Sequence, residues 1–191
     1  RRQRLAARPR GVSAPPTYAR APRLQTDRLS LRPPRAQAAG AYRDVYADGA
    51  ASAFYGGPLP EHRAWMRLAA DIGHWSLRGF GVFALVHRGE TVGGCGLHHP
   101  QGWPSHELTW WLTPGARGAG LAREASEAVL DWARDALGWT AVATHMKDDD
   151  LQARRLAERL GFALHRRETF PDGVARDVLR RPLGAVGGAS A

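Results

Sequence analysis

Cysteine and lysine are almost missing from this sequence of 191 residues, which contains only Cys95 and, among its 27 basic residues, only Lys147. A single cysteine excludes an internal disulfide, so we expect a reducing, cytoplasmic setting. In the stretch VGGCGL, Cys95 is expected to be a small buried thiol rather than a nucleophile. No apolar run approaches the ~20 residues that a membrane-spanning helix needs, and we expect no membrane association. The dominance of arginine over lysine is typical of a GC-rich, bacterial genome.

Acidic residues are absent from positions 1–23, which carry seven of the arginines. The rest of the chain has 20 basic and 18 acidic residues, so most of the net charge of +9 belongs to this segment. Its Pro- and Arg-rich composition without apolar periodicity predicts a disordered tail. The segment lacks the apolar core of a secretory signal, and its prolines interrupt the amphipathic helix of a transit peptide. A nucleic-acid-binding arm is the alternative interpretation.

Segments with strand and helix patterns mix along residues 24–182. Alternating or short apolar runs predict strands at 26–33, 80–89, 90–99, 105–113 and 139–146, and a terminal hairpin around Pro171, Asp172 and Gly173. Helical spacing predicts helices at 35–48, 61–79, 121–138 and 148–161. This order predicts one α/β (α+β) domain over residues 24–182, built on a mixed sheet, and a flexible C-terminal tail at 183–191.

The stretch GARGAG, residues 115–120, separates a predicted strand from a predicted helix. A dinucleotide-binding G-x-G-x-x-G would need glycine where Arg123 stands, and a Walker A loop would need lysine where Leu121 stands. What remains, from Arg117 to Ala122, fits R/Q-x-x-G-x-G/A. Short side chains there would expose N–H groups at a helix N-terminus, which suits a diphosphate. A plain strand-to-helix turn is the alternative.

This hexamer resembles the acetyl-CoA pyrophosphate signature of the GNAT acyltransferase superfamily. Further segments resemble the branch that contains the RimJ/RimL ribosomal-protein N-terminal acetyltransferases, in the expected order: LQTDRLSLRP, AWMRLAADIGHWSLRGFGVFAL, GGCGLHHPQGWPSHELTWWL and DDDLQARRLAERLGF. The resemblance covers residues 24–181. It implies a mixed sheet whose central strands splay and are flanked by helices. It also implies acetyl-CoA as co-substrate and no metal.

The resemblance also implies roles for particular residues. Pantetheine would lie in the gap between the splayed strands and bond to the main chain of Trp110, Trp111 and Leu112, with Leu112 near the thioester oxygen. The pyrophosphate would lie on the loop formed by Arg117, Gly118, Ala119, Gly120, Leu121 and Ala122. Glu107 is the candidate general base, with a simple ion pair to an arginine as the alternative. Candidates for the acceptor pocket are Trp75, His98, His99 and Trp103. His98, His99 and His106 have no recognisable zinc-binding spacing.

Two departures from the family pattern concern the second cofactor helix. The usual asparagine is replaced by Asp150, which accepts but does not donate hydrogen bonds when ionised. Relatives keep a Ser or Tyr near the thiol where this chain has Ala153 and Ala157. No acid is therefore evident to protonate the departing CoA, although water could serve.

The sequence thus predicts an N-acetyltransferase, a monomer or homodimer, that moves an acetyl group from acetyl-CoA to a primary amine by direct attack in a ternary complex. The acceptor could be a protein N-terminus or a small-molecule amine. A non-catalytic acetyl-CoA-binding domain is one alternative. A nucleic-acid-associated protein that uses the basic tail is the other, and we expect nucleic-acid binding to be absent.

Overall fold

Eight strands form one sheet in the computed structural model, which describes residues 21–184. Their order across the sheet is β1-β2-β3-β4-β5-β6-β8-β7. The strands are β1 Leu24–Gln25, β2 Ser30–Arg32, β3 Val82–His87, β4 Glu90–His98, β5 Glu107–Leu112, β6 Ala141–Met146, β7 Ala163–Thr169 and β8 Ala175–Pro182.

The pairing of β5 with β6 differs from all other pairings in the sheet. These two strands are parallel, whereas the other neighbouring strands are antiparallel. Their register contains only the pair Glu107 and Ala143, while β4 and β5 pair at six positions. The two strands therefore diverge beyond Glu107. A mixed sheet with splayed central strands, as predicted, is confirmed.

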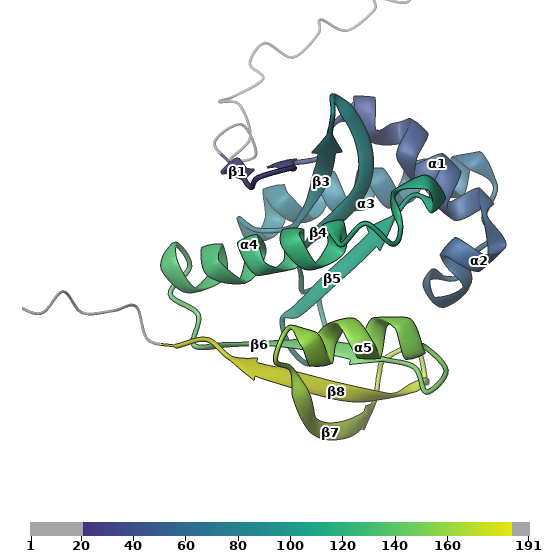
Figure 1. Ribbon diagram of the computed structural model, residues 1–191. Helices are drawn as coiled ribbons and strands as arrows, with labels where there is room; N and C mark the ends of the chain where they lie inside the picture. Colours follow the sequence, from purple (N-terminus) through teal and green to yellow (C-terminus); the bar gives the residue numbers. More distant parts are fainter. Residues whose placement is uncertain (1–20, 185–191) are drawn as a thin grey trace, which may run out of the picture.

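Helices cover both faces of the sheet (Figure 1). Their bounds are α1 Ala39–Ala47, α2 Gly49–Ser52, α3 Glu61–Arg78, α4 Leu121–Asp135 and α5 Leu151–Arg159, with short 3-10 turns η2 Ala36–Ala38, η3 Ala53–Tyr55 and η4 Pro114–Ala116. On one face, Tyr42 of α1 and Leu68 of α3 pack with Ala84 and Trp111 of the sheet. The opposite face carries α4 and α5.

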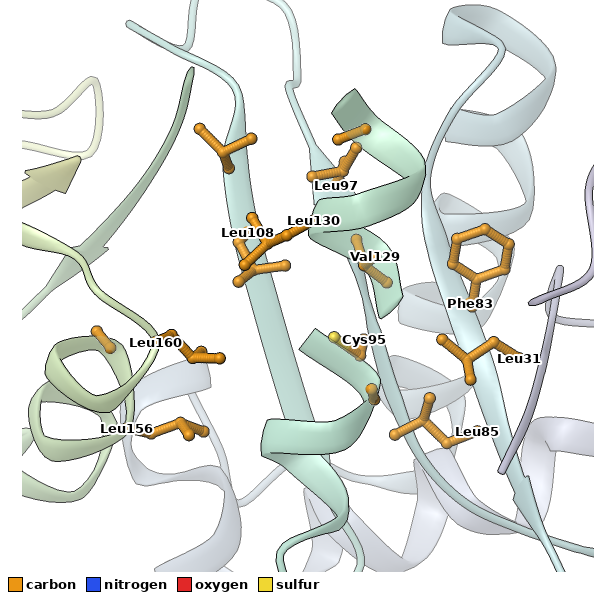
Figure 2. Packing of buried hydrophobic residues seen from close by; sticks show 14 of the residues in the cluster. Leu31, Phe83, Leu85, Cys95, Leu97, Leu108, Val129, Leu130, Leu156 and Leu160 are labelled. Atoms are coloured by element: carbon orange, nitrogen blue, oxygen red, sulfur yellow. The ribbon is translucent and has the colours of Figure 1, made fainter. Parts of the chain in front are cut away.

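The larger core lies between the sheet and these two helices, and Figure 2 shows its packing. Val129 and Leu130 of α4 and Leu156 of α5 project toward Leu108 and its sheet neighbours. Every third or fourth residue of α4 is apolar, so one stripe of the helix is buried. Cys95 is fully buried in this core, and burial raises the pKa of its thiol to about 12. The expected buried thiol is confirmed.

Several predicted boundaries are wrong. Of the strand expected at 26–33, only β2 is a strand, because Thr26 N–H donates to Leu29 O at 2.9 Å and closes a turn that follows β1. The helix expected from residue 35 becomes α-helical only at Ala39. Leu183, assigned to the tail, is 7% exposed, and its N–H donates to Thr140 O at 2.8 Å. The tail regions 1–20 and 185–191 lie outside the described residues. Within residues 21–184, no helix has the length and apolar character to cross a membrane.

Candidate active site

The glycine-rich loop ends where α4 begins. Gly118 and Gly120 have left-handed backbones, with φ of 79° and 78°, which glycine adopts without strain. A Cβ at Gly118 would meet nothing within 4 Å, so backbone conformation rather than crowding requires glycine there. Residues 117–120 are exposed, and the first turn of an α-helix has N–H groups without helical partners. This geometry suits a diphosphate.

The turn between β1 and β2 supports this loop from the side. Arg28 Nη1 donates to Ala119 O at 2.8 Å, and Arg28 Nη2 lies 2.6 Å from Glu124 Oε2. The Thr26 hydroxyl donates to Glu124 Oε1 at 2.5 Å. Partial burial acts to raise the pKa of Glu124, but the hydrogen bonds from Thr26 and Arg28 outweigh it and lower that pKa. Sequence analysis missed this support because Arg28 and Glu124 are 96 positions apart.

Main-chain groups of β5 point alternately toward β4 and toward the gap beside β6. Thr113 N–H donates to Val92 O of β4 at 2.9 Å, which sets the alternation of the antiparallel ladder. Trp111 therefore exchanges its main-chain hydrogen bonds with Gly94, whereas Trp110 and Leu112 face the gap. This corrects the expectation that the Trp111 main chain serves pantetheine, because β4 already occupies it.

A tyrosine from the α1–α3 face contacts the same gap. Tyr55, at the end of η3, donates its hydroxyl proton to Trp110 O at 2.5 Å. Burial raises the pKa of Tyr55 well above its usual range, and Asp150 and Glu107 act in the same direction. Tyr55 therefore remains protonated at neutral pH. Sequence analysis missed it because the segment around it has no periodicity that would place it against β5.

Three tryptophans singled out in the sequence have packing roles. Trp111 is 7% exposed and lies edge-to-face with Tyr42, ring centroids 4.6 Å apart. Trp110, on the opposite face of β5, packs against the larger core. Trp75 is 1% exposed, and its Nε1–H donates to Val82 O at 2.8 Å. The expectation that Trp75 lines the acceptor pocket is therefore wrong, because the side chain is buried in the core.

A cavity of about 530 Å³ lies beside the divergence of β5 and β6. Residues of α1, η3, α3, β4, β5, β6 and β8 line it, and both Trp110 and Tyr55 contribute. Of the predicted site residues, Glu107, His98, Trp103, Trp111 and Asp150 also line it. The structure thus brings the candidate base, two of the candidate acceptor residues and the start of α5 to one cavity.

Two aromatic rings, those of Trp103 and His145, contact the Glu107 carboxylate. The carboxylate is 8% exposed, Trp103 Nε1–H donates to its Oε2 at 2.7 Å, and His145 Nε2 lies against the same oxygen. The other oxygen, Oε1, is 3.8 Å from His98 Nδ1. Because Oε2 is already engaged by two groups, Oε1 is the oxygen free to accept a proton. None of the charged partners of Glu107 is an arginine within 4.0 Å, so the simple arginine ion pair is not formed.

His145 was not singled out in the sequence, yet it is the nearest titratable neighbour of Glu107. Burial lowers the pKa of His145, with a further decrease from Arg176, although the Glu107 charge acts to raise it. The imidazole is therefore neutral at pH 7. Trp103 Nε1–H lies within hydrogen-bond distance of both Glu107 Oε2, at 2.7 Å, and His145 Nε2, at 3.0 Å. Only the β5–β6 register brings these two residues together, and the sequence does not reveal that register.

The remaining histidines lie apart from the cavity. His99 Nε2 bonds to Trp103 O at 3.0 Å, and its ring packs on His106 with centroids 4.4 Å apart. Neither His99 nor His106 lines the cavity, so the expectation for His99 is wrong: its ring turns toward His106. No group of three or more His, Cys, Asp or Glu residues within 21–184 could hold a metal ion.

The two departures from the family pattern, at Asp150 and at Ala153 and Ala157, lie at or near the start of α5. Asp150 Oδ1 accepts the Ala153 N–H at 3.1 Å and so caps α5. Burial raises the pKa of Asp150, although the Ala153 hydrogen bond acts to lower it. Ala153 lines the cavity, whereas Ala157 is 0% exposed and belongs to the core. A longer side chain at Ala157 would therefore have to displace core atoms.

A second buried carboxylate lines the cavity. Asp71 of α3 accepts a hydrogen bond from the Tyr42 hydroxyl at 2.5 Å. Burial raises the pKa of Asp71, while Tyr42, His98 and Arg67 act to lower it. The cavity is thus lined by four carboxylates, those of Asp71, Glu107, Asp150 and Asp172, of which Glu107 and Asp150 were expected from the sequence to be site residues.

Parallel strands that part in mid-sheet leave main-chain donors and acceptors for a ligand lying between them like an added strand. The exposed loop between β5 and α4 has the geometry that suits a diphosphate. In coenzyme A, pantetheine is joined to a diphosphate, in the same order as the gap beside β5 and the loop that follows it. The fold and site therefore define a coenzyme A-dependent acyltransferase.

The family model described as "Acetyltransferase (GNAT) domain" matches residues 28–163, and the chain belongs to this family. It is thus an acetyl-CoA-dependent N-acetyltransferase, as predicted, with acetyl-CoA as co-substrate. The main-chain groups of Trp110 and Leu112 and the loop from Arg117 to Ala122 are the parts of this chain that fit the co-substrate.

Similar solved structures agree with this assignment. An acetyltransferase from Agrobacterium tumefaciens str. C58 is 29% identical, with a TM-score of 0.76, over 94% of this chain and 98% of the other. A GnaT-family acetyltransferase from Bordetella pertussis is 31% identical, with a TM-score of 0.70, over 84% and 99%. RimL, a ribosomal L7/L12 alpha-N-protein acetyltransferase solved with coenzyme A, is 14% identical, with a TM-score of 0.69, over 85% and 98%. The fold therefore resembles RimL.

Proposed function

We propose that this enzyme acetylates a primary amine of low pKa, with the α-amine of a peptide as the first candidate, by direct attack in a ternary complex. An α-amine with a pKa near 8 is neutral in roughly 10–20% of molecules at pH 7, whereas a lysine amine is neutral in about one of 2,500. A carboxylate is a weak base, which suits the first of these. The name of RimL, an alpha-N-protein acetyltransferase, supports the same choice.

The observation that carries this proposal is the engagement of Glu107. Its Oε2 receives Trp103 Nε1–H at 2.7 Å and contacts His145, which leaves Oε1 for the amine. The amine nitrogen attacks the carbonyl carbon, the C–S bond breaks, and the nitrogen proton passes to Oε1 directly or through water. The N–H of Leu112, which faces the gap, donates to the carbonyl oxygen as negative charge develops there.

Protonation of the departing thiolate completes the reaction. Tyr55 places a protonated hydroxyl in the gap, at 2.5 Å from Trp110 O. We assign it the hydrogen bond to the departing sulfur that Ala153 and Ala157 cannot make, while solvent supplies the proton that converts the thiolate to the thiol and takes up the proton that Glu107 received. The products are then the amide and free coenzyme A, so atoms and charge balance.

An amine panel tests the proposal. Release of CoA thiol is measured with a peptide that has a free α-amine, the same peptide Nα-acetylated but containing lysine, a polyamine and an amino sugar. We expect the free α-amine to be acetylated fastest near neutral pH. Binding of acetyl-CoA without thiol release for any amine would show instead a non-catalytic acetyl-CoA-binding domain.

The Glu107→Gln variant tests the base. It keeps the shape and the Trp103 contact, and we expect kcat/KM to fall by about 10² to 10⁴ with acetyl-CoA affinity retained. Glu127→Gln, which removes an exposed carboxylate paired with Arg123, is the matched control and should behave as wild type. Equal activity of the two variants would remove Glu107 from the mechanism.

The proposal also covers the cellular location and the oligomeric state of the enzyme. The single cysteine supports a reducing, bacterial cytoplasm as its location. We place it there as a monomer or homodimer that acts on peptide or small-molecule amines and needs no metal. Gel filtration with light scattering distinguishes the two oligomeric states.

A further inference from the structure

A second cavity, of about 270 Å³, lies between η2 and the sheet, and residues of β2, β3 and β4 line it. It shares no lining residue with the active-site cavity. Arg23, Arg32 and Arg35 line it, and no Asp or Glu does. Three guanidinium groups therefore border one hollow without an acidic neighbour in its wall. The acetyl-transfer chemistry uses none of these residues.

The three arginines have no carboxylate partners. Within residues 21–184, none of them forms an ion pair or a side-chain hydrogen bond. The segments outside this range contain no Asp or Glu in their sequence. By contrast, Arg167 and Arg176 each bond to a carboxylate. Cations that border the same hollow repel one another, so a bound anion would relieve an unfavourable arrangement.

The backbone holds this arrangement in place before any ligand binds. Arg32 is the last residue of β2, where strand alternation turns its side chain away from buried Leu31. The next two residues, Pro33 and Pro34, are buried and fix their own φ angles. They set the position of Arg35, which is extended at φ −135°. The backbone positions of the two arginines are thus fixed, and only their exposed side chains remain to be ordered when a ligand binds.

Small residues form the floor of the hollow, and further donors complete its rim. Ala38 is 1% exposed and Ala84 is 4% exposed, so short side chains leave the space open. Gln37 and Thr91 add an amide and a hydroxyl to the lining. The wall therefore offers guanidinium, amide and hydroxyl donors without carboxylate acceptors, which is the donor set that phosphate oxygens favour.

We propose that this hollow, the Arg23–Arg32–Arg35 site, binds a small ligand carrying a phosphate or diphosphate group. Its volume lies near the lower end of small-ligand sites, which suits a diphosphate or the phosphate end of a nucleotide rather than a nucleic-acid helix. The guanidinium groups donate hydrogen bonds to the phosphate oxygens, and the adjoining part of the ligand packs against the alanine side chains of the floor. The site is independent of the proposed acceptor and of the roles of Glu107 and Tyr55.

Inorganic pyrophosphate is the probe, titrated calorimetrically into the full chain at low salt. Coenzyme A is present at saturation, so that the loop before α4 is occupied. We expect one pyrophosphate per chain, with affinity that falls as salt rises. In the double variant Arg32→Gln/Arg35→Gln we expect the affinity for pyrophosphate to fall by at least about thirtyfold, because two charge-assisted contacts are removed. The variant should still bind coenzyme A.

Arg63→Gln/Arg159→Gln is the matched control, since both residues are exposed, lie outside both cavities and remove the same charge. Its pyrophosphate affinity should stay within about twofold of wild type. Equal loss in both variants would show nonspecific charge attraction and overturn the site. Absence of pyrophosphate binding, or binding of an RNA oligonucleotide that pyrophosphate does not displace, would overturn it as well. If coenzyme A fails to bind, the enzyme assignment fails, while the comparison of the two variants still decides this site.

Discussion

The hydroxyl of Tyr55 would have different partners in the empty site and in the site with a ligand bound along β5. In the structure it bonds to Trp110 O at 2.5 Å, where a ligand lying along β5 would place its own donor. Occupation of the gap would therefore release the hydroxyl beside the reacting groups. Tyr55→Phe should lower kcat by about tenfold to a hundredfold, and acetyl-CoA should bind at least as tightly because Trp110 O is free.

For Tyr55→Phe, both kcat and the dissociation constant of acetyl-CoA must be measured, because the two roles change them differently. A merely structural role would weaken acetyl-CoA binding and lower the unfolding temperature without a specific loss of kcat. An unchanged kcat in Tyr55→Phe would show that the Tyr55 hydroxyl does not assist departure of the thiolate.

His74 links stability to pH. Its Nδ1–H donates to Phe80 O at 2.9 Å, and its Nε2 accepts His99 N–H at 2.9 Å. Protonation of Nε2 would remove that acceptor, and burial lowers the pKa of His74 below its ordinary 6.5. The unfolded chain therefore takes up the proton first, and stability present above pH 6.5 is lost as pH falls toward the pKa of the folded state.

Urea unfolding at about pH 7.5 and about pH 5.5 measures this dependence. The free energy of unfolding should fall with acidification, and His74→Leu should reduce that fall even though it is less stable at neutral pH. His62→Gln, at an exposed position of α3, is the control. The same slope in His74→Leu and wild type would contradict the assignment.

Single residues were predictable from the sequence where a motif fixes both type and place. The loop from Arg117 to Ala122 follows from its glycines, and Glu107 follows from the family resemblance. His145 and Tyr55 do not, because only the packing of distant segments brings them to β5. Trp75 was misplaced because helical spacing shows that a side chain is buried but not which space it fills.

At the scale of elements, the loop before α4 depends on a segment from the other end of the sheet. Glu124 connects Arg28 and Thr26 to the first turn of α4. Glu124→Gln should weaken acetyl-CoA binding by roughly threefold to tenfold, because Arg28 loses a charge-assisted partner and no longer steadies Ala119 O. Glu127→Gln, one turn along the same helix, should leave the affinity unchanged, and calorimetry compares the two.

Equal affinities in these two variants would show that the loop keeps its shape without the β1–β2 turn. The same feature explains an error of prediction: strand propensity in LQTDRLSLRP suggests one strand, but Thr26 and Leu29 close a turn that brings Arg28 to the loop. The amphipathic helices α3 and α4 were predicted within a few residues, because their apolar spacing is long and regular.

At the scale of the whole molecule, the sheet gives the active site its form. The sequence predicts a mixed sheet but not the order in which β8 lies between β6 and β7. That order, with the single β5–β6 pair at Glu107, decides where the gap opens and which main-chain groups face it. The family resemblance implied the splayed strands. The ladder between β4 and β5 shows that the main chain of Trp111 faces β4 and not the gap.

Calorimetric titration with acetyl-CoA tests most directly the claim that the gap and the glycine loop hold the co-substrate. We compare wild type, Gly120→Trp and Gly138→Trp, since both glycines have positive φ, 78° and 67°, but Gly138 lies beyond the other end of α4. The account predicts micromolar binding in wild type and Gly138→Trp and its loss in a folded Gly120→Trp. Undiminished binding in Gly120→Trp, or no binding in folded wild type, would contradict it.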